Sequence, residues 1–128
     1  MDNLGGTQMA TILVVDDQEP IRALLRDALE GDGHEVLEAA NGRLGLELYR
    51  KRPADLIITD MVMPEMNGLD MLLELTRRSP NVKIIAISGG RESQGWLNAA
   101  KLLGTCQTFQ KPFDMKQLLS AVRYDLVH

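Results

Sequence analysis

Short apolar runs alternate along this chain with patterns that have helical spacing. The runs at 11–15 and 56–59 are continuous, which is typical of strands buried on both faces of a parallel sheet. The other strand candidates are residues 82–88, the weaker run 106–110 and the more polar run 34–39. These patterns predict five strands.

Apolar residues between the runs recur three and four positions apart, as on one face of a helix. The first helix is predicted from Ile21, Leu24, Leu25, Ala28 and Leu29, with Pro20 near its start and Gly31 and Gly33 at its end. Four further patterns contain Leu44, Leu48 and Tyr49; Leu69, Leu72, Leu73 and Thr76; Trp96, Ala99, Ala100 and Leu103; and Met115, Leu118, Leu119, Val122 and Leu126. We expect Asn41 and Asp114 to cap the second and fifth helices. Trp96 serves either packing, which we favour, or a partner surface on the fourth helix.

Five strand–helix repeats predict an α/β fold with helices on both faces of a parallel sheet. The expected strand order is 2-1-3-4-5, which is the flavodoxin-like arrangement, and ligands in such folds bind at the carboxyl ends of the strands. The chain of 128 residues suits a single domain, predicted at 11–126, after a flexible leader at 1–10.

Composition narrows the classes of function. The net charge of −4 argues against nucleic acid as the main partner, because phosphate backbones attract basic surfaces. Cys106 is the only cysteine, so no intrachain disulfide can form. No apolar run reaches the ~18 residues that a membrane span needs, so we expect a cytoplasmic protein without membrane contact.

Polar residues stand where the predicted strands end. Asp16 and Asp17 follow the first strand, Asp60 the third, Ser88 the fourth and Lys111 the fifth. Each alone is a common turn or surface residue. Because parallel strands end at the same edge of a sheet, we expect all five side chains there, with Asp60 at the centre.

This group of residues suits phosphoryl transfer. Three neighbouring carboxylates repel one another, and a hard cation such as Mg²⁺ would offset that repulsion. A carboxylate can also act as the nucleophile that accepts a phosphoryl group. Lys111 would then neutralise phosphoryl charge, and Ser88 would donate a hydrogen bond to a phosphoryl oxygen.

The motifs "ILVVDD" (12–17), "ITDMVMPEMNGLD" (58–70), "IIAISG" (84–89) and "KPF" (111–113) carry a resemblance. From Thr11 to Leu126 the chain resembles the receiver domain of bacterial two-component response regulators, of the single-domain type without an output domain. The resemblance implies a signalling switch rather than an enzyme. It also implies a histidine kinase or phosphotransfer protein as phosphoryl donor, and a monomer or a phosphorylation-dependent dimer.

The resemblance assigns roles to the residues at the strand ends. It implies that Asp60 is the phosphoacceptor, Ser88 the switch hydroxyl and Lys111 the lysine that contacts the phosphoryl group. Mg²⁺, or Mn²⁺, would bind to Asp16, Asp17, Asp60 and the backbone carbonyl of Val62. Phosphorylation would change the surface formed by the fourth helix, fifth strand and fifth helix. Pro64 and Gly68 match the turn after the phosphoacceptor, and a cis peptide is expected at Lys111–Pro112.

The chain departs from the family pattern at several positions. Thr108 stands where the family often has a switch aromatic, and Phe109 should point to the opposite face of its strand. Gly89 replaces a common alanine. Val62 and Gly90, at positions that tune dephosphorylation in the family, have no side chain that could position a water.

Two other functions remain open at this stage. A phosphatase of the haloacid dehalogenase type also uses aspartate, Ser/Thr and lysine, but its nucleophile lies in a D-x-D motif, whereas "VVDDQE" has adjacent aspartates. A flavin mononucleotide module would need a loop rich in hydroxyl groups and glycine after the first strand, which "DDQEP" is not.

Overall fold

The computed structural model describes residues 9–63, 66–105 and 107–128. Five parallel strands form one sheet in the order β2-β1-β3-β4-β5, which confirms the predicted flavodoxin-like topology. The strands are β1 Thr11–Val15, β2 Glu35–Ala39, β3 Leu56–Asp60, β4 Lys83–Ser88 and β5 Gln107–Gln110. All five residues of the central strand β3 are buried, as expected from its continuous apolar run.

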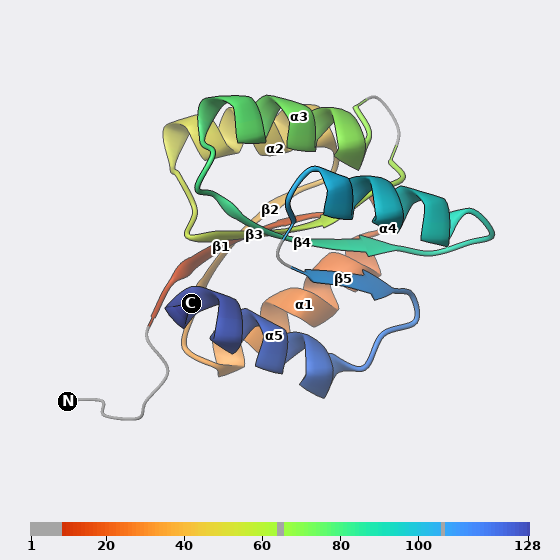
Figure 1. Cartoon of the computed structure of the whole chain (residues 1–128). Helices are drawn as coiled ribbons and strands as arrows, with labels where there is room; N and C mark the ends of the chain where they lie inside the picture. Colours follow the sequence, from red (N-terminus) through yellow and green to blue (C-terminus); the bar gives the residue numbers. More distant parts are fainter. Residues whose placement is uncertain (1–8, 64–65, 106) are drawn as a thin grey trace.

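The helices cover the sheet in two layers (Figure 1). They are α1 Glu19–Gly31, α2 Gly42–Lys51, α3 Gly68–Arg78, α4 Ser93–Leu102 and α5 Met115–Val127. Helices α2, α3 and α4 lie over one face of the sheet, and α1 and α5 lie over the other. Among the described residues, no helix has the length and apolar character needed to cross a bilayer.

Each face of the sheet has its own hydrophobic core. Ile57 belongs to the cluster under α2, α3 and α4, whereas its neighbours Leu56 and Ile58 belong to the cluster under α1 and α5. This division follows from the alternation of side chains along a strand. Trp96 is partly buried against the first cluster, which confirms its predicted packing role.

Side chains cap the helices at the predicted positions. The Asn41 side chain accepts a hydrogen bond from Leu44 N at 2.9 Å, and the Asp114 side chain accepts one from Lys116 N at 2.8 Å. The Asn67 side chain caps α3 in the same way, by accepting from Asp70 N at 2.9 Å, which the sequence analysis did not predict. These bonds satisfy backbone donors that have no partner within the helix.

Three leucines in the helical patterns, Leu24, Leu44 and Leu73, do not reach the core. Leu24 and Leu73 are 55% and 49% exposed, although they share the spacing of buried neighbours. A helix packed on a sheet buries a single stripe, and the adjacent Leu25 and Leu72 occupy it.

The N-terminal leader and two other predicted features fall at least partly outside the described residues. Residues 1–8 of the leader, Pro64 of the predicted turn and Cys106 of the predicted fifth strand are in this group. Ala10, at the end of the predicted leader, is buried, and its backbone N donates to Nδ1 of His34 at 3.1 Å.

Candidate functional site

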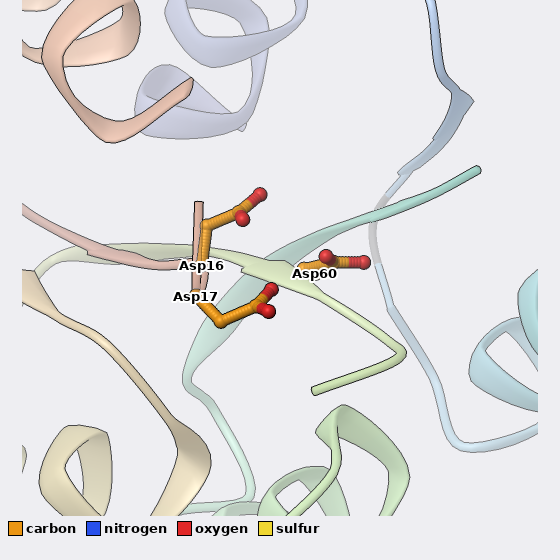
Figure 2. Close-up of side chains that lie close together, drawn as sticks. All are labelled: Asp16, Asp17 and Asp60. Carbon is orange, nitrogen blue, oxygen red and sulfur yellow. The ribbon is translucent and has the colours of Figure 1, made fainter. Parts of the chain in front are cut away.

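Three carboxylates meet at the edge of the sheet where the parallel strands have their carboxyl ends (Figure 2). Asp16 and Asp17 follow β1, and Asp60 is the last residue of the adjacent strand β3. One oxygen from each residue lies within 4.8 Å of the others. Asp16 and Asp60 are buried, whereas Asp17 is exposed. The strand order alone accounts for this meeting, because β1 and β3 are neighbours.

Lys111 joins this group from the loop after β5. Its Nζ lies 3.0 Å from Oδ2 of Asp16 and 3.1 Å from Oδ2 of Asp60. The same Nζ donates to Oε1 of Gln18 at 3.0 Å. The peptide Lys111–Pro112 is cis, as expected from the resemblance. Lys111 therefore contacts the two buried carboxylates directly, although it follows β5, which lies two strands away from β3 in the sheet.

The environment raises the pKa values of both Asp60 and Lys111. Burial raises the pKa of Asp60, and the charge of Asp16 raises it further, while Lys111 and the backbone N of Val62 oppose the rise without cancelling it. Burial lowers the pKa of Lys111, but the hydrogen bonds and charges of Asp16 and Asp60 outweigh it, so the net shift is upward. Ionisation of the Asp60 carboxyl is thus disfavoured, whereas protonation of the neighbouring Lys111 amine is favoured.

Backbone groups fix the orientation of the two buried carboxylates. Oδ1 of Asp16 accepts from Gln18 N at 2.8 Å, and Oδ1 of Asp60 accepts from Val62 N at 3.3 Å. The guanidinium of Arg22 donates to the backbone carbonyl of Asp16 at 2.7 Å. In both carboxylates, Oδ1 bonds a backbone N–H and Oδ2 bonds Lys111.

Ser88 lies at the end of β4 but below the surface of the site. It is fully buried, and its Oγ has no hydrogen-bond partner within the described part of the chain. Its backbone carbonyl accepts from Lys111 N at 2.7 Å, which ties the end of β4 to the lysine loop. A buried hydroxyl without a partner costs free energy, so an acceptor supplied from outside the chain would relieve that cost.

A pocket of about 360 Å³ opens over the carboxylates. It is lined by Asp17, Gln18, Asp60, Val62, Gly89, Gly90 and Lys111. Glycine at position 89 lets the chain pass close to the lysine stem, since an added Cβ would lie 3.1 Å from Cβ of Lys111. The pocket presents acidic oxygens and an ammonium together, which suits a hard cation with an anionic group.

The first residue of α3 lies tightly against the end of β3. Gly68 N donates to the carbonyl of Met61 at 3.0 Å. A Cβ on Gly68 would collide with the backbone carbonyl of Asp60 and would lie 2.7 Å from Cα of Met61. Glycine is therefore required where α3 begins, because the helix starts in contact with the backbone that carries Asp60.

The structure brings together the predicted site residues Asp16, Asp17, Asp60 and Lys111. Val62 lies two residues after Asp60 and bonds its carboxylate, and Ser88 ends the neighbouring strand β4. The sequence analysis missed Gln18. Its position directly after the two aspartates was the only available signal, since its contact to Lys111 joins residues 93 positions apart.

Residues 12–123 match the protein family described as the response regulator receiver domain. The chain belongs to this family. Among its relatives, sporulation initiation phosphotransferase F of Bacillus subtilis is 34% identical over 88% of this chain and 90% of that protein. Chemotaxis protein CheY of Thermotoga maritima is 36% identical over 87% of this chain and 92% of that protein. Receiver domains are signalling switches, and the match gives no support to the phosphatase alternative.

Solved receiver domains have the same fold. A response regulator receiver domain protein from Clostridium thermocellum superposes with a TM-score of 0.85 at 31% identity, covering 92% of this chain and 94% of that one. The receiver domain of NtrX from Brucella abortus has the same TM-score at 28% identity, covering 91% and 98%.

Other relatives are much longer than this chain. The transcriptional regulator NtrC of Azospirillum brasilense is 40% identical over 88% of this chain, but the matched part is only 23% of NtrC. The similarity to such proteins concerns the receiver domain alone.

Proposed function

We propose that this receiver domain is a phosphorylation switch in which Asp60 accepts the phosphoryl group. The observation that carries the proposal is the ammonium of Lys111, which lies within hydrogen-bond distance of both buried carboxylates, Asp16 and Asp60. A lysine in this position offsets the negative charge that phosphorylation adds. Asp60 ends the central strand and lines the pocket, so an incoming phosphoryl group can reach it.

We propose Mg²⁺, or Mn²⁺, as the metal of this site. The clustered oxygens of Asp16, Asp17 and Asp60 are ligands that hard cations prefer, and the backbone carbonyl of Val62 would add a fourth. The bound cation would neutralise charge on the carboxylates and the phosphoryl oxygens.

The reaction requires one bond to form and one to break. A carboxylate oxygen of Asp60 attacks phosphorus, while the bond from phosphorus to the donor's leaving group breaks and the leaving group keeps the electron pair. With a histidine kinase or phosphotransfer protein as donor, the leaving group is the histidine nitrogen. Lys111 stays protonated throughout and stabilises the phosphoryl oxygens.

The output of the switch is a change in partner binding. Ser88 has an unpartnered buried hydroxyl that a phosphoryl oxygen on Asp60 would engage. Movement of Ser88 would be passed to α4 and β5, because the Gln110 side chain donates to Oγ of Ser93 at 2.9 Å and Lys111 N bonds the Ser88 carbonyl. The surface of α4, β5 and α5 would then favour a different partner state.

The relatives and the charge of the chain support the proposed partners. The relatives include proteins named sporulation initiation phosphotransferase and sensor kinase, so the phosphoryl donor is proposed to be a histidine kinase or a phosphotransfer protein. We propose a cytoplasmic protein that acts as a monomer or a phosphorylation-dependent dimer. With a net charge of −4, direct binding of nucleic acid by this domain is not expected.

Acetyl phosphate with Mg²⁺ tests the phosphoacceptor. Intact-mass analysis should show one added phosphoryl group on the wild-type chain and none on Asp60→Asn. Asp70→Asn is a matched control, because Asp70 lies outside the site at the start of α3. A phosphoryl group that persists on Asp60→Asn would place the nucleophile elsewhere and overturn the proposal.

The metal assignment has its own test, which needs no phosphoryl donor. Millimolar Mg²⁺ should raise the melting temperature of the wild-type chain, because a ligand of the folded state stabilises that state. Asp17→Asn should remove most of the gain, and the same loss is not expected for Asp27→Asn, whose side chain lies on the exposed surface of α1. An unchanged Mg²⁺ response in Asp17→Asn would contradict the assignment.

A further inference from the structure

The ammonium of Lys111 has used all of its donors. A lysine ammonium carries three N–H groups. In this structure they have three acceptors at hydrogen-bond distance, namely Oδ2 of Asp16 at 3.0 Å, Oδ2 of Asp60 at 3.1 Å and Oε1 of Gln18 at 3.0 Å. A phosphoryl group on Asp60 would bring further acceptor oxygens with about −1.5 to −2 charges. Lys111 can donate to them only by giving up one of its present bonds.

The bond to Gln18 is the one that Lys111 can most easily release. Asp16 is a carboxylate, and a charged acceptor binds an ammonium more strongly than a neutral amide oxygen does. On phosphorylation Asp60 becomes an acyl phosphate, so the lysine bond to Asp60 passes to the phosphoryl oxygens, and a second bond to those oxygens requires the donor that Gln18 holds. Gln18 is also exposed, so water can replace the lost contact on both sides. Asp16 is buried and is not modified by phosphorylation, so losing the lysine would leave its charge without compensation.

The position of Gln18 in the chain indicates that its side chain serves the site rather than the helix. Gln18 is the N-cap residue of α1, where Ser, Thr, Asp and Asn are preferred because they accept from the first backbone N–H groups. The Gln18 side chain makes no capping hydrogen bond to the described residues of α1. Its backbone N instead bonds Asp16 at 2.8 Å, which holds the residue beside the carboxylates while its amide oxygen reaches Lys111.

We infer that Gln18 is a positioning residue that occupies the third donor of Lys111 before phosphorylation and yields it to the phosphoryl group. This inference rests on the proposed role of Asp60 as phosphoacceptor. It makes the strength of the amide–ammonium contact a determinant of how readily the phosphorylated state forms. A glutamine at position 18 therefore holds the ammonium of Lys111 in place, but weakly enough that the ammonium can still turn toward a phosphoryl group.

Two substitutions at position 18 have opposite expected effects. Gln18→Ala removes the competing acceptor while Asp16 and Asp60 still hold the lysine, so a phosphoryl group should be bound more tightly. Gln18→Glu replaces the amide with a carboxylate that holds the third donor more strongly, so binding should weaken. The expected change for Gln18→Ala is about two- to tenfold, the factor that corresponds to one hydrogen bond of ordinary net strength.

Beryllofluoride with Mg²⁺ is a suitable probe, because it mimics an aspartyl phosphate without turnover. Its affinity can be measured through the fluorescence of Trp96, the only tryptophan in the chain. The experiment compares the wild type with Gln18→Ala and Gln18→Glu, and repeats all three in a Lys111→Ala background. Gln117→Ala, an exposed glutamine on α5, is the matched control. Gln18→Ala should bind tighter than the wild type, and this gain should vanish without Lys111.

The outcomes separate this inference from the proposed function. Unchanged or weaker binding in Gln18→Ala would overturn the inference, and weaker binding would mean that the amide itself contacts the phosphoryl group. A gain that persists in the Lys111→Ala background would also overturn it, because the effect would not pass through the lysine. Failure of acetyl phosphate to modify the wild-type chain at Asp60 would instead overturn the proposed function, whatever the beryllofluoride affinities are.

Discussion

Asp60 carries a free-energy cost that its proposed role as phosphoacceptor would explain. Burial and the charge of Asp16 raise its pKa above the usual range, so the ionised side chain is less favourable in the folded protein than in the unfolded chain. Lys111 reduces this cost without removing it. Active sites commonly contain such destabilised charges, because the arrangement is complementary to a ligand that is added later.

Asp60→Asn should therefore stabilise the metal-free protein at neutral pH. Asparagine keeps an acceptor for Lys111 and removes the disfavoured charge. A rise of a few degrees in melting temperature is expected, the response to about 1 kcal/mol in a domain of this size. The difference from wild type should shrink as pH falls through the raised pKa of Asp60, since protonation then removes the charge from the wild type as well. A melting temperature below that of the wild type would contradict this account.

Protonation of His34 should change the free energy of unfolding with pH in the opposite direction to protonation of Asp60. It is 4% exposed, its Nδ1 accepts from Ala10 N, and its Nε2 has no partner in the part of the chain that the structure describes. Burial lowers the pKa of His34, and Arg123 lowers it further, against the raising effect of Asp32. Because the unfolded chain binds a proton near pH 6.5 and the folded protein resists it, stability should fall as pH decreases below about 6.5.

Denaturant unfolding between pH 7.5 and 5.5 checks this effect. His34→Gln keeps an acceptor for Ala10 N and does not titrate, so the loss of stability on acidification should be smaller than in the wild type. His128→Gln is the matched control, because that ring is exposed. Equal pH dependence in His34→Gln and the wild type would rule out His34 as its source.

At the scale of elements, the ends of the strands and the starts of the helices form the site together. Strand β3 delivers Asp60, and α3 begins with Gly68 in contact with the carbonyl of that aspartate. Helix α2 begins against the same loop, since a Cβ on Gly42 would lie 2.6 Å from the carbonyl of Met66. Met61 and Met66 thus each lie against a helix start that needs glycine.

Gly68→Ala tests this close approach. The added Cβ would have to displace backbone, so we expect a loss of about 1–3 kcal/mol in the free energy of unfolding and slower phosphorylation by acetyl phosphate. Gly95→Ala is the matched control in α4, because a Cβ there meets nothing within 4 Å. That change should stabilise the protein by about 0.5–1 kcal/mol, as expected for alanine in a helix. Equal stability effects of the two substitutions would show that the Gly68 contact is not tight.

At the scale of the whole molecule, the proposed switch requires the site to act on a distant surface. Thr108 stands where the family resemblance predicts a switch aromatic, and Phe109 is partly buried against the core cluster under α1 and α5. Two physical connections lead from the site toward α4: the carbonyl of Ser88 accepts from Lys111 N, and the Gln110 side chain donates to Ser93 at the start of α4. We therefore expect the loop after Ser88 to carry the response.

Hydrogen exchange across residues 88–103 measures this coupling. Phosphorylation should change exchange in the wild type, and Ser88→Ala should blunt the change while leaving phosphorylation largely intact. The phosphoryl–hydroxyl bond that is lost is worth roughly 1.5–3 kcal/mol, enough to shift a two-state population. Thr108→Ala should have little effect. The reverse result, with Thr108→Ala abolishing the response and Ser88→Ala retaining it, would exclude coupling through Ser88.

The order of strands and helices and the edge of the sheet that carries the site could be predicted from the sequence. Continuous apolar runs such as 56–59 indicate buried parallel strands, and strands of that kind end at one edge, so Asp16, Asp60 and Lys111 had to gather there. These properties depend on local periodicity and on a small set of allowed topologies.

Only the tertiary structure decided which polar atoms meet. Distances between residues far apart in the chain determine which three acceptors Lys111 meets. Tertiary packing also determines that a Cβ on Gly68 would collide with backbone, and that Leu24 and Leu73 are exposed. Periodicity places a side chain on a face, but hydrogen bonds require approach to about 3 Å, which packing of the whole core determines. Gln18 could therefore not be predicted as a site residue, because its contact is with Lys111 from the other end of the chain.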